Sequence, residues 1–111
     1  MATDRAGPDD LVCDEHLARA FAFLGKRWTG IVIGTLTARP AGFAELSRAI
    51  PGISESVLSD RLSELASAGL VSREVREGPP VGVVYRLTPA GKALSPALKA
   101  LARWACNNLS L

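Results

Sequence analysis

The spacing of apolar residues along the chain predicts a series of helices. Five stretches repeat apolar positions every three or four residues, as a helix with one buried face does. They cover about residues 13–24, 28–36, 43–49 and 55–68, and a last stretch that starts at residue 89. Leu17, Phe21 and Leu24 share one face of the first stretch. The positions expected to be buried are Ile31, Val32, Phe43, Leu46, Ile50, Leu58, Leu62 and Leu65. In the last stretch, the positions directed toward the core or a partner are Leu94, Leu98, Leu101 and Trp104.

Residues at the ends of these stretches agree with helix limits. Ser54 and Thr88 can each accept a free backbone N–H as an N-cap, and Pro89 follows at the first position of the last helix. Gly69 stands where a left-handed C-cap is expected. Pro96 is expected to kink or restart the last helix.

Between the fourth and fifth helices the pattern becomes extended. Residues 70–76 and 83–87 read as strands, and the sequence EGPPVG between them reads as a turn, so the segment predicts a β-hairpin. Two helices joined by a short Gly-containing turn and followed at once by a hairpin are the layout of a winged helix-turn-helix. The predicted fold class is therefore mainly α with a small β-hairpin (α+β).

Composition is that of one globular domain. The chain has 111 residues, of which 48% are hydrophobic. Residues 1–9 read as a flexible N-terminal arm, and residues 10–111 as the winged helix-turn-helix domain with dimerisation helices at both ends. We find no membrane-length apolar run and no secretion signal, which favours a cytoplasmic protein without a membrane partner. Two cysteines and one histidine do not make a convincing metal site, and no cofactor is predicted.

The fourth predicted helix has the properties of one that enters the major groove of DNA. Opposite its buried leucines it carries small hydroxyl residues, which allow close approach and hydrogen-bond phosphates or bases. Arg61 can reach a phosphate or a guanine, or it can pair with Glu64 one turn away. The candidate DNA-binding residues of this helix and its cap are Ser54, Ser56, Ser59, Asp60, Arg61 and Ser63.

Arginines outside this helix complete the candidate interface. Arg39 and Arg48 lie near the ends of the third predicted helix, and Arg73 and Arg76 lie on the hairpin. A single surface arginine is more often a solvated charge than a contact, so the case depends on the arrangement. The net charge of +2 permits nucleic-acid binding without requiring it.

Four stretches occur in order that together are quite specific. They are LGKRWTGIVI (24–33), FAELSRAIPGISESVLSDRLSELASAGLVSREV (43–75), VYRLTPAGKAL (84–94) and Trp104. With these motifs the chain resembles the HxlR-type transcription regulators, relatives of the MarR-like winged-helix proteins, from Cys13 to about Ala105. The resemblance implies a cytoplasmic homodimer that binds an inverted-repeat operator in double-stranded DNA.

The resemblance also implies where the dimer forms. In the family the first and last helices usually make the interface, and the matching residues here are Leu17, Phe21, Leu98, Leu101 and Trp104. A two-fold dimer would hold its two DNA-reading helices about 34–36 Å apart, one turn of DNA.

The chain departs from the family pattern in two places. Val81 and Gly82 occupy the wing where relatives often carry an arginine, and Asp60 replaces a neutral or basic residue.

Some relatives sense electrophiles, quinones or oxidants through a cysteine that matches Cys13. A helix N-terminus favours the thiolate, and His16 lies one turn on, whereas Asp10, Asp14 and Glu15 oppose it. Cys13 is therefore a redox-sensing candidate, and the alternative is a small buried or interface residue.

Further alternatives stay open at the level of sequence. An apolar pocket lined by Phe21, Phe23 or Trp28 can hold a small-molecule effector, although the core also explains these residues. His16 can bind a metal or ligand but is more often structural or exposed, and Cys106 is expected to serve packing. Because the fourth helix is weakly charged, a second function stays open, namely a protein-interaction module without specific DNA binding. No acid–base pair, phosphate loop or nucleophile motif indicates an enzyme.

Overall fold

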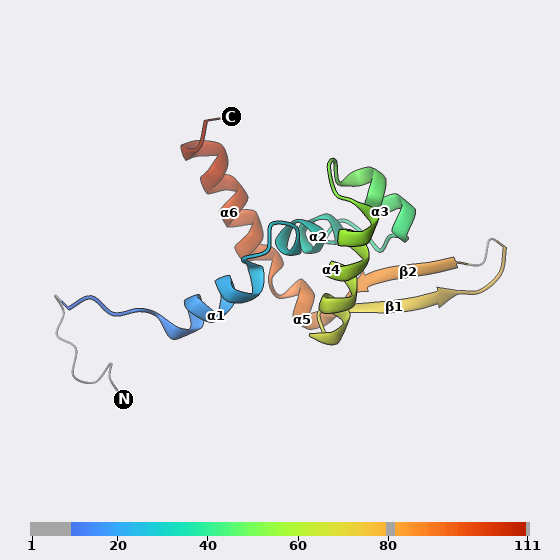
Figure 1. Cartoon of the computed structure of the whole chain (residues 1–111), viewed down its shortest axis with the longest axis horizontal. Coiled ribbons are helices and arrows are strands. Elements are labelled where there is room, and N and C mark those ends of the chain that lie inside the picture. The colour runs from blue at the N-terminus through green and yellow to red at the C-terminus, as the bar shows by residue number, and fades with distance from the viewer. Residues whose placement is uncertain (1–9, 80–81, 111) are drawn as a thin grey trace.

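The computed structural model describes residues 10–79 and 82–110. In this part of the chain, one antiparallel hairpin projects from a helical body (Figure 1). The elements are α1 (Glu15–Leu24), α2 (Thr29–Leu36), α3 (Phe43–Ala49), α4 (Glu55–Ser67), β1 (Val71–Arg76), β2 (Gly82–Leu87), α5 (Pro89–Lys92) and α6 (Ser95–Asn108). The predicted order of elements and the fold class are confirmed, whereas the predicted arm of residues 1–9 lies outside the described residues.

The predicted caps form hydrogen bonds at the helix ends. Ser54 Oγ accepts the Val57 N–H at 3.1 Å, and Thr88 Oγ1 accepts the Gly91 N–H at 3.2 Å. Gly69 adopts a left-handed backbone with φ of 79°, which lets the chain leave α4 directly for β1. Thr88 also donates its hydroxyl to the Gly69 carbonyl at 2.7 Å, so the end of α4 is tied to the start of α5.

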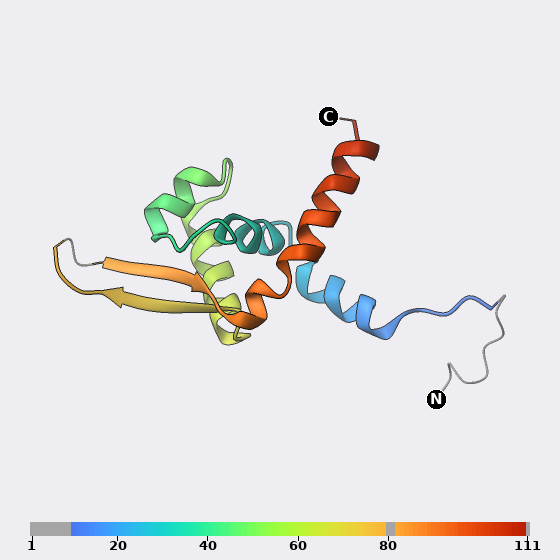
Figure 2. The ribbon, with the colours of Figure 1, turned by 180° about the vertical axis from the view of Figure 1, so that it is seen from behind.

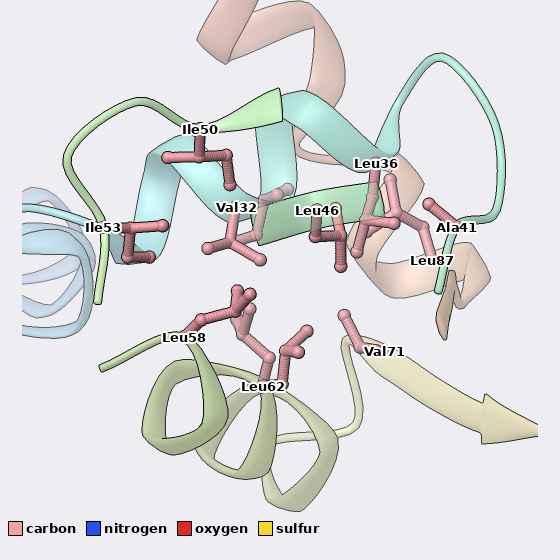
Figure 3. Packing of buried hydrophobic residues seen from close by; sticks show 12 residues of the cluster. Val32, Leu36, Ala41, Leu46, Ile50, Ile53, Leu58, Leu62, Val71 and Leu87 are labelled. Carbon is pink, nitrogen blue, oxygen red and sulfur yellow. The ribbon is translucent and has the colours of Figure 1, made fainter. Parts of the chain in front are cut away.

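A core of aliphatic side chains holds α4 against α2 and α3. Figure 3 shows Leu58 and Leu62 of α4 directed toward Val32 and Leu46 across the interface. These four side chains are at most 2% exposed, so they lie at the centre of the core. The other members of the core are Ile33, Leu36, Ala41, Ile50, Ile53, Leu65, Val71 and Leu87.

The β-hairpin is joined to the helical body by a third extended segment. Val71 pairs with Leu87 at the base of the hairpin, and Arg76 pairs with Gly82 near its tip. Ala41, just before α3, exchanges both backbone hydrogen bonds with Tyr85 of β2, at 3.1 and 2.8 Å. These bonds occupy the outer edge of β2 and fix the direction in which the hairpin leaves the core.

Helices α1 and α6 extend from the end of the molecule opposite the hairpin (Figures 1 and 2). Neither helix has a fully buried residue, which is unusual for helices with clear apolar faces. None of the helices in the described ranges combines the length and the apolar character needed to cross a membrane.

One predicted core position is wrong. Ile31 is 42% exposed, whereas the adjacent Val32 is fully buried. Helix α2 packs on the core through Thr29, Val32, Ile33 and Leu36, a stripe with helical spacing. This stripe spans the arc from Val32 to Ile33, and Ile31 lies about 100° from Val32 on the opposite side, outside the stripe.

Two helical glycines have opposite surroundings. A Cβ on Gly91 would overlap the carbonyl oxygen of Leu70, because α5 passes directly over the start of the hairpin. A Cβ on Gly34, inside α2, would meet no atom within 4 Å.

We therefore expect the same substitution to change stability in opposite directions. Gly91→Ala should lower the free energy of unfolding by about 1–3 kcal/mol, because backbone must move to relieve the overlap. Gly34→Ala should raise it by about 0.5–1 kcal/mol, because alanine restricts the unfolded chain and favours helix. Urea unfolding followed by circular dichroism measures both, and equal effects would contradict the close approach at Gly91.

Candidate nucleic-acid interface

Helix α4 presents one buried and one exposed face. Leu58, Leu62 and Leu65 are buried in the core. On the other side Ser56, Ser59, Asp60 and Ser63 are exposed, as the sequence predicts for a groove-binding face. The oxygen of Ser54, the remaining predicted serine, is already occupied as the N-cap of α4.

Arg61 points along the helix toward Glu64. Its Nη2 donates to Glu64 Oε2 at 3.0 Å, and its side chain is only 15% exposed. The Nε atom is buried and has no hydrogen-bond partner within the described part of the chain. Of the two interpretations given by the sequence, the structure therefore shows the ion pair with Glu64.

A third charged group joins this pair from outside the helix. Lys26 Nζ, in the turn between α1 and α2, donates to the same Glu64 Oε2 at 2.8 Å. The hydrogen bond from Lys26, together with the charges of Lys26 and Arg61, holds the pKa of Glu64 below its usual value. No periodic signal reveals this contact, because 38 residues separate its two members.

The two arginines beside α3 differ in their partners. Arg39 donates to Glu45 Oε2 at 2.6 Å and to the Pro40 carbonyl at 2.9 Å. The other oxygen of Glu45 accepts the Gly42 N–H at 3.0 Å, so the same carboxylate caps α3. Arg48, exposed in the last turn of α3, makes no ion pair with any described residue.

The predicted arginines of the hairpin lie on opposite faces of β1. Arg73 and Arg76 are separated by an odd number of positions, and side chains alternate along a strand. Arg76 lines a cavity of about 420 Å³ together with Arg39 and Arg86, and Arg73 does not. Arg86 pairs with Glu74 across the strands at 3.0 Å. The predicted arginines therefore do not form one continuous basic surface.

The residues predicted to hold a dimer are mostly exposed. Leu17 and Phe21 of α1 and Leu101 and Trp104 of α6 are between 50% and 56% exposed. Leu98 is half-buried and packs against the core of its own chain beside Gly30. The four exposed side chains belong to the two helices that extend from the molecule.

Cys13 lies immediately before the first turn of α1 and is exposed. Asp14 caps this helix, because its Oδ1 accepts the N–H groups of His16 and Leu17 at 2.9 and 3.1 Å. These two bonds lower the pKa of Asp14. The N–H groups of His16 and Leu17 at the helix N-terminus are thus bonded to Asp14 and not to the Cys13 thiol.

Cys106 is also exposed, so the packing role expected for it is not met within the chain.

One apolar cavity lies beside α1. It has a volume of about 340 Å³ and is lined chiefly by Phe23 and Leu24 of α1, by Leu70 just before β1 and by Leu94 at the start of α6. Phe23 was expected in such a pocket. Phe21 and Trp28 were also expected but are not among the lining residues of this cavity.

Comparison with known proteins gives a family match. The model described as HxlR-like helix-turn-helix matches residues 23–111. The chain is also 42% identical over 86 residues to the HTH-type transcriptional regulator YodB of Bacillus subtilis (strain 168). That alignment covers 78% of this chain and 77% of YodB.

Solved structures agree with the match. The quinone-bound form of YodB from B. subtilis has a TM-score of 0.72 and 36% identity, and the alignment covers 86% of this chain and 99% of that one. The redox regulator HypR in its reduced form has a TM-score of 0.78 and 30% identity, with 85% and 93% covered. The similarity therefore includes most of this chain.

The Glu45 contacts generate a prediction about pH. Hydrogen bonds from Arg39 and Gly42 lower the pKa of Glu45 to about 2. Because the folded value lies below the unfolded one, the contribution of Glu45 to stability is present above the unfolded pKa and is lost as the pH falls through the folded value. A carboxyl titration by nuclear magnetic resonance should give this pKa, and Arg39→Gln should raise it. An unchanged pKa in that variant would contradict the ion pair.

Proposed function

Because the chain belongs to the HxlR-like helix-turn-helix family of transcription regulators, we propose that it binds an inverted-repeat operator in double-stranded DNA as a homodimer. The observation that supports this most is the exposed polar face of α4, which stands clear of the core next to the hairpin (Figure 1). A helix of this length with small side chains can lie in a major groove while a hairpin reaches the adjacent backbone.

The proposed contacts divide into two groups. Ser56, Ser59, Asp60 and Ser63 would face the base edges, and Asp60 would accept from a cytosine amino group. The remaining predicted residues would position the protein on phosphates, and of these Arg48, Arg73 and Arg76 have no ion pair with any described residue. The other members of this group are Arg39 and Ser54, whereas Arg61 is held in its ion pair with Glu64.

The proposed dimer uses the helices that extend from the molecule. Leu17 and Phe21 of α1 and Leu101 and Trp104 of α6 expose large apolar groups that a second copy would cover, with Leu98 at the base. Interfaces between identical chains are rich in such aromatic and aliphatic side chains. A two-fold dimer of this kind also matches a pseudo-palindromic operator.

We further propose that Cys13 makes the regulator responsive to oxidants or electrophiles. The support is its exposed thiol just before the helix proposed to contact the partner, together with similarity to a redox regulator and to a regulator solved with bound quinone. An oxidant such as diamide takes two electrons and two protons from two thiols, which join as a disulfide. A small-molecule effector is an alternative signal, and the cavity beside Phe23 is its candidate site.

A protein-interaction module without specific DNA binding is the second candidate function. It is favoured by the ion pairs of Arg39, Arg61 and Arg86, which neutralise three cations around α4 and the hairpin. In either case we propose a cytoplasmic protein without catalytic activity, in keeping with a family of regulators.

Titration onto duplex DNA separates the two functions. We expect selection from a random duplex library to enrich an inverted repeat that two chains bind, with an affinity that falls as salt rises. Arg48→Ala should reduce the slope of log affinity against log salt by about 0.9, the value for one phosphate contact. Arg103→Ala removes an equal charge from α6, away from α4, and should leave the slope unchanged. No enrichment of any sequence would favour the protein-interaction module.

Oxidation tests the proposed sensor. We expect diamide to weaken operator binding of the wild-type chain and dithiothreitol to restore it, because a disulfide at α1 would rearrange the dimer. Cys13→Ser should bind the operator normally and lose the response to diamide. Cys106→Ser, with the same change at the other cysteine, shows whether that thiol is the disulfide partner. A full diamide response in Cys13→Ser would exclude Cys13 as the sensor.

A further inference from the structure

Two cations from separate parts of the chain meet at one carboxylate oxygen on α4. Lys26 and Arg61 both donate to Glu64 Oε2, at 2.8 and 3.0 Å. We call Lys26, Arg61 and Glu64 the Glu64 cluster. Arg61 is the most enclosed member, with 15% of its side chain exposed, against 41% for Glu64 and 54% for Lys26.

The cluster supplies a kind of contact that the core beneath α4 lacks. Leu58, Leu62 and Leu65 hold α4 by apolar burial, which is non-directional and permits small rotations of a helix on its support. Hydrogen bonds between charged groups require defined directions and distances. The bond from Lys26 therefore fixes the rotation of α4 relative to the turn that follows α1.

The cluster also determines where Arg61 points. The ion pair with Glu64 is the one hydrogen-bonded contact that the structure gives its guanidinium, since the buried Nε has no partner among the described residues. A buried guanidinium without an anion is costly. Without the Glu64 charge, Arg61 would turn outward to water or to a phosphate.

From this geometry we propose that Glu64 is a positioning residue for DNA recognition, an inference that rests on the proposed function. It fixes the orientation of α4 through Lys26 and keeps Arg61 away from the DNA-facing surface. Glu64 thus favours the correct sequence over unrelated DNA, although a carboxylate on this helix would by charge alone repel both.

The proposal and simple electrostatics predict opposite signs. If Glu64 only repelled phosphate, Glu64→Gln would strengthen binding to every duplex. If it positions α4, Glu64→Gln should weaken binding to the correct sequence and strengthen binding to unrelated DNA, because Arg61 is released. The ratio of the two affinities separates these cases.

The matched control is Glu55→Gln. Glu55 is an exposed glutamate in the first turn of the same helix, and it makes no ion pair within the described chain. The probes are a duplex selected from a random library by the wild-type protein and a scrambled duplex of equal composition. Hydrogen exchange of the α4 amides, measured without DNA, reports directly on how firmly the helix is held.

We expect Glu64→Gln to lower the ratio of selected to scrambled affinity by about twofold to fivefold, the scale of a partly exposed ion pair. Lys26→Met should lower it similarly and add little in the Glu64→Gln background, since the two residues act together. Both variants should speed exchange in the second half of α4. Glu55→Gln should change neither the ratio nor the exchange.

Two results would overturn the proposal. One is a Glu64→Gln variant whose ratio of selected to scrambled affinity equals that of the wild type. Partial unfolding alone would also leave this ratio unchanged, because it reduces both affinities by the same factor. The other is a Lys26→Met variant that weakens both duplexes by the same factor with a smaller salt slope, which would make Lys26 a phosphate contact. If the wild type selects no sequence, the proposed function fails, and unchanged α4 exchange in both variants would then separately overturn the positioning role.

Discussion

The packing of the leucine stripe of α4 against α2 and α3 is the constraint on which the other features depend. Leu58 and Leu65 are completely buried, and Leu62 nearly so, so one face of α4 cannot leave the core without exposing most of it. Burial of that face obliges the opposite face to meet solvent. The same packing sets the start of the hairpin, because Gly69 turns the chain from the end of α4 directly into β1.

Three arginines around α4 and the hairpin are neutralised by nearby carboxylates. Arg39, Arg61 and Arg86 each have a carboxylate partner within about one hydrogen-bond length, at 2.6 to 3.0 Å. A surface of this kind attracts DNA only weakly through net charge. Recognition would then depend on the fit of small side chains to the groove and on the exact orientation of α4, which is the property that the Glu64 cluster controls.

The two ends of the molecule have different tasks in this proposal. The hairpin end carries polar and charged side chains, and the α1 and α6 end carries exposed apolar ones such as Phe21 and Trp104. The turn that holds Lys26 lies between them, directly after α1 and in contact with α4 through Glu64. Lys26 therefore links the end of the molecule that carries α1 to α4, the helix proposed to read DNA.

Local features were determined by the sequence itself. The order of elements, the caps at Ser54 and Thr88 and the exposed serine face of α4 all follow from periodicity and capping, which act over a few residues. Even the opposite faces of Arg73 and Arg76 follow from strand alternation.

Only the tertiary structure decided the rest. Ile31 is exposed because the core meets another stripe of α2, and Glu64 also binds Lys26 because the turn after α1 lies against α4. These outcomes depend on contacts between segments far apart in the chain, whose distances no local pattern records.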